Sequence, residues 1–159
     1  MTVCNVWISA ERAMVSVDSM CEHPDGSCGE RSKLFLVPHA LAVLSGRGRI
    51  DYLAAVLQRI AVDGGNFDEV ADSMPSTMHS AQESMVAAGV KEIGGQVFWW
   101  VGYSARSRRI LAWRYERPCS TAPIEVRSLP RSGAAGATLS PWEPSEQGEP
   151  PCEPDDDAG

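Results

Sequence analysis

Thr2 is the residue of this chain that is best placed to act as a nucleophile. A threonine in second position is small enough that methionine aminopeptidase normally removes Met1, which leaves Thr2 with a free α-amine. An unperturbed α-amine has a pKa of about 8, so part of it is neutral at working pH. It can then act as general base for the hydroxyl of the same residue, which activates a weak nucleophile. Many chains begin with Met-Thr, so this interpretation depends on the residues around Thr2.

The elements that must position Thr2 are short strands near the start of the chain. Strands are expected at 3–9 and 13–18, and a turn between them folds the second strand back along the first. Asp18, at the far end of the second strand, then lies close to the start of the first. The chain loops away through a segment rich in glycine, proline and cysteine, and it returns at Lys33, which opens a third strand. An aspartate and a lysine therefore converge on the N-terminus.

These side chains suit the chemistry of an N-terminal threonine. A lysine ammonium beside the Thr2 hydroxyl would lower the pKa of that hydroxyl, and Asp18 would hold Lys33 charged and oriented. A fourth strand is expected at 40–44, and Gly46 follows it in a segment that breaks the strand. A glycine there can offer an exposed backbone N–H to a developing oxyanion. The candidate catalytic residues are therefore Thr2, Asp18, Lys33 and Gly46.

The rest of the first 127 residues alternates between strands and helices. Near-continuous apolar runs at 34–37 and 40–44 predict strands covered on both faces. Asn66 and Glu69 resemble a capping box at the start of a helical segment. The further expected elements are a helix at 50–61, a helical turn to Met74, an interruption at Pro75, a helix at 76–88, a hairpin of 96–103 with 110–116, and a short strand at 124–127. Helices between a first sheet block and a later hairpin predict an α+β fold with helices packed on a sheet face.

The composition changes from Ser128 onward. Residues 128–159 hold seven acidic side chains and a single basic one, Arg131, so they carry −6 of the net charge of −7. Residues 1–127 hold fourteen acidic and thirteen basic side chains, which leaves −1. A segment with six prolines and few large apolar residues cannot bury enough surface to offset the entropy of ordering. We expect a folded domain at 1–127 and a disordered, acidic, proline-rich tail at 128–159, which either aids solubility or docks on a basic partner.

The set of residues resembles that of the proteasome β-subunit family, and most closely its bacterial HslV-type peptidases. The matching pieces are Thr2 behind a removable Met1, Val15-Ser16-Val17-Asp18-Ser19, Ser32-Lys33-Leu34, and Leu44-Ser45-Gly46-Arg47-Gly48 ahead of an amphipathic helix. The resemblance spans 2–127 and is most specific over 2–60. It implies an N-terminal-nucleophile hydrolase with a four-layer αββα sandwich. It also implies that Thr2 is nucleophile and base, that Lys33 lowers its pKa, that Asp18 anchors the lysine, and that Gly46 is the oxyanion donor.

The chain departs from this family in its second half. Family members continue with further helices and strands that complete the sandwich, whereas this chain turns into the proline-rich tail after its second hairpin. Ser132-Gly133-Ala134-Ala135-Gly136 resembles the segment that supports the threonine amine, but the later supporting aspartate has no counterpart. A truncated sandwich leaves one sheet face bare, and a second subunit or another partner must then cover it.

Two functions follow from these observations. One is a threonine-type N-terminal-nucleophile hydrolase that cleaves peptide or amide bonds and assembles as a homo-oligomer. The other is a non-catalytic structural or assembly protein on the same scaffold, such as a component of a phage or prophage particle. The set of Thr2, Asp18 and Lys33 favours the hydrolase, because a scaffold protein has no need of it. The short sandwich and the tail favour the structural protein.

The cysteines argue against a disulfide framework and against a metal site. Their number is five, which is odd, and no two are spaced as Cys-x-x-Cys. Cys21, His23 and Cys28 could be imagined as zinc ligands, but a fourth ligand is missing, so we expect no metal and no cofactor. No apolar stretch approaches the roughly 20 residues of a membrane span. The first residues lack a signal-peptide pattern, and we therefore expect a cytoplasmic protein that does not contact a membrane.

Aromatic and basic side chains gather in the second hairpin and raise the question of nucleic-acid binding. They are Trp99, Trp100, Tyr103, Trp113 and Tyr115, beside Arg106, Arg108, Arg109, Arg114 and Arg117. Aromatic rings interleaved with arginines can stack on bases and contact phosphates. The domain is not basic, however, and the arginines cluster at the hairpin turn. We therefore expect a packed hairpin with a solvated tip and no nucleic-acid partner.

Overall fold

The computed structural model describes residues 4–9, 11–22, 28–91 and 93–129, and Thr2 lies outside these ranges. The strands are β1 (Cys4–Ile8), β2 (Ala13–Val17), β3 (Met20–Glu22), β4 (Cys28–Glu30), β5 (Leu34–Val37), β6 (Ala42–Arg47), β7 (Gln96–Ser104), β8 (Arg109–Arg117) and β9 (Glu125–Ser128). The helices are α1 (Ile50–Asp63) and α2 (Phe67–Ala87), and Pro38–Ala40 form a single 3₁₀ turn. No helix within the described ranges is long and apolar enough to cross a membrane.

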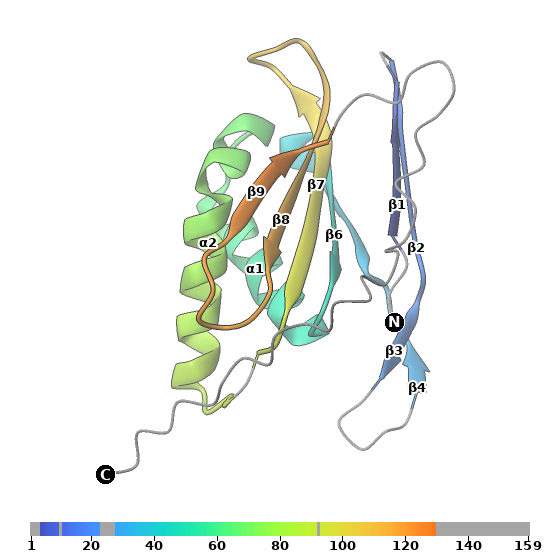
Figure 1. The fold of residues 1–159 in the computed structure, drawn as a ribbon. Coiled ribbons are helices and arrows are strands. Elements are labelled where there is room, and N and C mark those ends of the chain that lie inside the picture. Colours follow the sequence, from blue (N-terminus) through green and yellow to red (C-terminus); the bar gives the residue numbers. More distant parts are fainter. Residues whose placement is uncertain (1–3, 10, 23–27, 92, 130–159) are drawn as a thin grey trace.

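A five-stranded antiparallel sheet, in the order β5-β6-β7-β8-β9, forms the middle layer. Both helices pack on one of its faces, and the β1–β2 hairpin packs on the other (Figure 1). Successive side chains of a strand point to opposite faces, so each strand of the sheet supplies both layers. The α+β fold with helices on a sheet face, which the sequence predicts, is confirmed.

The helix-facing side of the sheet carries the larger core. Phe98 and Trp100 of β7 and Tyr115 of β8 are fully buried there. The ring of Tyr52 stacks on Phe98 with 5.6 Å between the ring centroids, and Phe67 stacks on Trp100 at 5.7 Å. The other buried helix residues in this core are Leu53, Val56, Ile60, Val70, Met74, Met78, Ala81 and Met85. Large rings bury much apolar area in fixed geometries, so these contacts set how the helices lie on the sheet.

The β1–β2 hairpin forms a separate, smaller layer. Cys4, Val6 and Ile8 alternate toward the sheet and are buried, in the two-residue period of a strand with one covered face. They pack on Val101 of β7 and Ala112 of β8. A hairpin of two strands is marginally stable by itself, so this packing is what holds it in place.

The first half of the chain differs from the sequence expectation in three places. β3 and β4 pair as an antiparallel hairpin within a segment that was expected to be a loop. β6 begins at Ala42 and runs to Arg47, because the 3₁₀ turn occupies the residues just before it. β5 was expected to be covered on both faces, but it is an edge strand, and Leu36 is 75% exposed.

The end of the described chain continues past the expected domain boundary at residue 127. β9 runs to Ser128, and the N–H of Leu129 donates to the Ala112 carbonyl at 2.9 Å. The Leu129 side chain packs beside the β1–β2 hairpin. The folded part of the chain therefore includes Ser128 and Leu129, two residues more than expected. The second helical layer of an αββα sandwich is not among the described residues.

Helix α2 continues through Pro75, where the sequence predicts an interruption. A proline lacks the N–H that would bond the carbonyl four residues earlier, which here is the carbonyl of Ala71. The hydroxyl of Tyr115 reaches from β8 and donates to this carbonyl at 2.9 Å. A side chain from the sheet thus replaces the donor that the proline removes, and the helix does not need to end.

Replacing Tyr115 by Phe should lower the free energy of unfolding by about 1–3 kcal/mol, because the Ala71 carbonyl then loses its donor inside the core. In a Pro75→Ala background the restored N–H serves that carbonyl, so the same replacement should cost clearly less. Urea unfolding of the four proteins measures both costs. Equal costs in the two backgrounds would contradict this account of the helix.

Candidate active site

A buried ion pair joins the end of β2 to the start of β5. Lys33 directly precedes β5 and is 5% exposed, and its Nζ lies 2.8 Å from Oδ1 of Asp18, which directly follows β2. The Asp18 side chain is 27% exposed, so the carboxylate keeps more contact with solvent than the ammonium does. The structure thus brings together the two charged residues that the sequence selects. Their expected partner Thr2 lies outside the described residues.

Strand register gathers the neighbouring groups at the same corner of the molecule. Cys4, the first described residue of β1, pairs with the residue just before Asp18. Ser45 of β6 pairs with the residue just after Lys33, so Gly46 lies at the next position along β6. We call this group of Cys4, Asp18, Lys33, Ser45 and Gly46 the Lys33 corner.

Gly46 lies inside β6, so the expectation that it follows the fourth strand, in the segment that breaks it, is wrong. It pairs with Phe98 of β7 and is buried. A Cβ at this position would lie 2.6 Å from a ring carbon of Phe98 and 3.1 Å from Cδ1 of Leu53. A glycine is therefore required here because the side chains of Phe98 and Leu53 approach the backbone closely, and not because the chain turns.

The backbone N–H of Gly46 points within the sheet toward β5. In an antiparallel ladder, alternate residues direct their N–H and C=O groups to the same neighbour. Tyr103 donates to the Leu41 carbonyl at 3.2 Å, so the odd-numbered residues that follow on β6 face β7. Gly46 is even-numbered, and it directs its N–H toward the side of β5, at the position next to Lys33.

Cys4 and Ser45 are members of the corner that the sequence reasoning did not select. Cys4 is 9% exposed, Ser45 is fully buried, and 3.8 Å separate the Sγ atom from the Oγ atom. Burial raises the pKa of the Cys4 thiol from 9.0 to about 11, the contact with Ser45 lowers it, and the charge of Asp18 raises it further. The one signal in the sequence was a serine inside an otherwise apolar strand. Because the charge of Asp18 raises the pKa of the Cys4 thiol, the start of β1 lies close enough to the ion pair to be affected by its charges.

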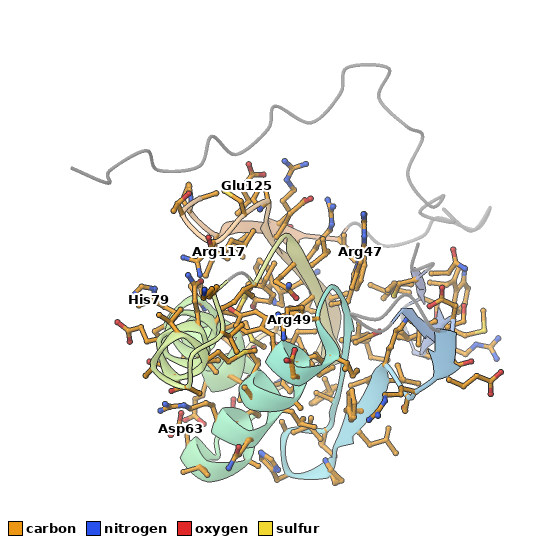
Figure 2. The ribbon with its side chains drawn as sticks, turned by 90° about the horizontal axis from the view of Figure 1, so that it is seen from below. Arg47, Arg49, Asp63, His79, Arg117 and Glu125 are labelled. Atoms are coloured by element: carbon orange, nitrogen blue, oxygen red, sulfur yellow. The ribbon has the colours of Figure 1, made fainter. Side chains whose placement is uncertain are left out.

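The turn from β6 into α1 is held by a buried glutamine. Gln96 accepts a hydrogen bond from the N–H of Arg49 at 3.2 Å and donates to the Ile93 carbonyl at 2.7 Å. Gly48 has a φ of +120°, and a Cβ there would lie 2.1 Å from the Gln96 side chain. Figure 2 labels Arg47 and Arg49, which flank this glycine. The end of β6 beside the corner is thus fixed by packing and by backbone conformation.

Among the side chains that the structure describes, no second cluster of metal-ligating or titratable candidates is found. No group of three His, Cys, Asp or Glu residues within the described ranges could hold a metal ion. The three residues considered as zinc ligands are Cys21, His23 and Cys28, and their side chains lie outside what the structure describes. His79 is exposed and lies 3.4 Å from Glu83 on the same helix.

The aromatic and arginine-rich hairpin is packed, as expected. Trp100 and Tyr115 are fully buried against the helices, whereas the turn residues 105–108 are exposed. The Arg106 guanidinium lies 2.7 Å from the Asp72 carboxylate of α2, and the backbone N–H of Arg106 donates to the Asp68 carboxylate. At the other end of β8, Arg117 donates to Ala122 and Gln82 and is nearly buried (Figure 2). The rings of Trp100 and Tyr115 therefore serve the core and are not free to stack on bases.

Comparison of the chain with protein-family models, with curated proteins and with solved structures finds no match. The Lys33 corner is the part of the described structure where charged groups are buried together. A buried ammonium stabilises the deprotonated form of a nearby hydroxyl, and a directed N–H stabilises an oxyanion. The corner thus holds one group that an acyl-transfer site needs, the buried ammonium, whereas the Gly46 N–H is directed at the backbone of the β5 side.

Removing the carboxylate of the ion pair should destabilise the protein more than removing the ammonium. Asp18→Asn leaves the Lys33 ammonium buried without its counter-ion, which should cost about 3–5 kcal/mol. Lys33→Met leaves a carboxylate that is 27% exposed to water and should cost less. The double variant should recover part of the loss. Denaturant unfolding at pH 7 measures all four proteins, and a larger cost for Lys33→Met would contradict the burial argument.

The raised pKa of Cys4 predicts a loss of stability in alkali. The thiol stays protonated to a higher pH in the folded protein than in the unfolded chain. Its contribution to the free energy of unfolding is therefore complete below pH 9 and is lost as the pH rises to about 11. The full loss is about 2–3 kcal/mol for a shift of this size. Unfolding of the wild type and of Cys4→Ala between pH 8 and 11 should show a steeper decline in the wild type. Parallel curves would show that Cys4 is not buried in this way.

Proposed function

We propose that this chain is a threonine-type N-terminal-nucleophile hydrolase that cleaves peptide or other amide bonds. The observation that carries the proposal is the buried pair of Lys33 and Asp18 beside the start of β1. Burying an ammonium costs several kcal/mol of desolvation free energy. A charged pair at this place would lower the pKa of the Thr2 hydroxyl if Thr2 is the nucleophile. Cys4, two residues after Thr2, already lies in the field of Asp18.

The proposed reaction begins with removal of Met1. The Thr2 Oγ attacks the carbonyl carbon of the amide while its proton passes to the α-amine of the same residue. Lys33 lowers the pKa of the hydroxyl, and Asp18 holds Lys33 in position. The N–H of Gly46, which the ladder directs at the backbone of Lys33, would have to turn from it to donate to the oxyanion of the tetrahedral intermediate. The α-ammonium then protonates the leaving amine, and the acyl group stays on Thr2 as an ester. Water hydrolyses this ester with the α-amine again as base.

Intact mass and an electrophile test this proposal. The purified protein should lack the mass of Met1, because a retained Met1 excludes the amine as base. An epoxyketone or β-lactone should then add once to the wild type and not to Thr2→Ala. Lys33→Met should slow the addition about a hundredfold, since it removes the stabilising cation. Lys91→Met is the matched control, because Lys91 is exposed and far along the chain from the corner.

The absence of an adduct on a protein that has lost Met1 would overturn the hydrolase. It would leave the alternative, a non-catalytic structural or assembly protein, as the better interpretation. Gly46→Ala is a poor probe of the oxyanion role, because the new Cβ would collide with Phe98 whatever the function. A homo-oligomer and a cytoplasmic location, both suggested by the sequence, remain part of the proposal, and sedimentation measures the first.

A further inference from the structure

An apolar groove runs along the β5 side of the hairpin layer, from Leu34, the residue after Lys33, to Leu41 and Tyr103. It has a volume of about 540 Å³ and runs between β2 and the sheet, where Ala13 and Val15 face Leu36, Val101 and Ile110. Of its twelve lining residues only Tyr103 carries a polar side-chain atom. A groove of this size and composition suits large apolar side chains.

The rim of the groove is as apolar as its floor. Leu36 is 75% exposed, Leu41 is 68% exposed and Tyr103 is 43% exposed. They lie beside β5, an edge strand of four apolar residues without a charge, whereas the opposite edge strand β9 carries Glu125 and Arg127. Natural sheets protect an exposed edge with charges. The β5 edge has the character of a surface that another segment covers.

The chain leaves the described structure on the same face. Leu129, the last described residue, donates to the Ala112 carbonyl and packs in the cluster that also contains Val101 and Ile110. Both of these residues line the groove. Ile110 is two residues from Ala112 along β8, which is about 7 Å. The following segment therefore starts next to the groove.

The sequence after Leu129 separates an apolar part from an acidic part. Residues 130–142 contain no acidic side chain, and their large apolar residues are Leu139 and Trp142. All seven acidic residues of the tail lie in 143–159. The ten residues from Leu129 to Leu139 can span up to about 33 Å, so they reach any part of the groove. Because the segment is tethered there, its effective concentration at the groove is high.

We propose that residues 130–142 of this chain fold back into the groove between β2 and the sheet, with Leu139 and Trp142 as anchors. The acidic residues beyond them stay in solvent, where their charge needs no partner. The docked segment covers the apolar rim and the β5 edge. This inference does not depend on the proposed hydrolase, and its test has no activity readout.

Cleavage by trypsin at Arg131 tests the docking in the full-length protein. Arg131 is the one basic residue of the tail, so cleavage there releases residues 132–159 with a defined mass. Cleavage should be slow in the wild type and about tenfold faster in Leu139→Ser/Trp142→Ser, because proteolysis follows the population of the open segment. Leu36→Asp, in the groove, should have the same effect. Val62→Asp on α1 is the matched control, since Val62 is exposed to a similar extent, 77%.

The outcomes separate the possible occupants of the groove. Equal cleavage rates in the wild type and in the tail variant would overturn the proposal. So would a dimer that Leu36→Asp dissociates in sedimentation while cleavage at Arg131 is unchanged, because a second copy would then occupy the groove. Faster cleavage in both variants at every protein concentration, with normal far-UV circular dichroism, supports docking within one chain.

Discussion

The burial of the Lys33 ammonium constrains how the hairpin lies on the sheet. An ammonium taken out of water costs several kcal/mol unless a carboxylate compensates it at contact distance. Lys33 belongs to the edge of the sheet, and Asp18 belongs to the end of the hairpin. A slip of one residue in the β1–β2 register would turn every side chain of the moved strand to the other face. The ion pair and the apolar alternation of β1 therefore demand the same register.

The groups around the ion pair are held by contacts that leave little freedom. Gly46 is packed against the Phe98 ring, and Gly48 is packed against Gln96 in a conformation that favours glycine. The Tyr52 hydroxyl donates to the Met78 carbonyl at 2.7 Å and ties α1 to α2 behind this end of the sheet. Preorganised groups of this kind are what an oxyanion site requires, because no reorganisation is then needed during the reaction.

The hairpin is too small a layer for the sheet that it covers. It closes on the sheet through Cys4 and the ion pair, and it leaves an apolar groove open along β5. The ion pair and the groove therefore both result from a hairpin that is smaller than the sheet it covers. The closed part holds an ammonium that is nearly inaccessible to water, and the open part exposes apolar surface.

Several of these features were predictable because they depend on neighbours in the sequence. The two-residue alternation of β1 and the hairpin turn place Asp18 near the start of the chain, and the Asn66 and Glu69 capping box forms as expected. The return of the chain at Lys33 was predictable from the same pattern. A two-layer packing of helices on a sheet followed from the order of the elements.

Other features depend on groups that are distant in the sequence. Whether Pro75 ends a helix was decided by Tyr115, which supplies a hydroxyl from forty residues away. The reason for Gly46 is the Phe98 ring across the ladder, and the burial of Ser45 comes from Cys4 on another layer. The sequence by itself determined most of the elements, their order and the charged residues that would meet, because these follow from local periodicity, but it did not reveal the β3–β4 hairpin or the continuity of α2. Only the tertiary structure decided which backbone groups are satisfied and which surface stays open, because both depend on contacts between layers.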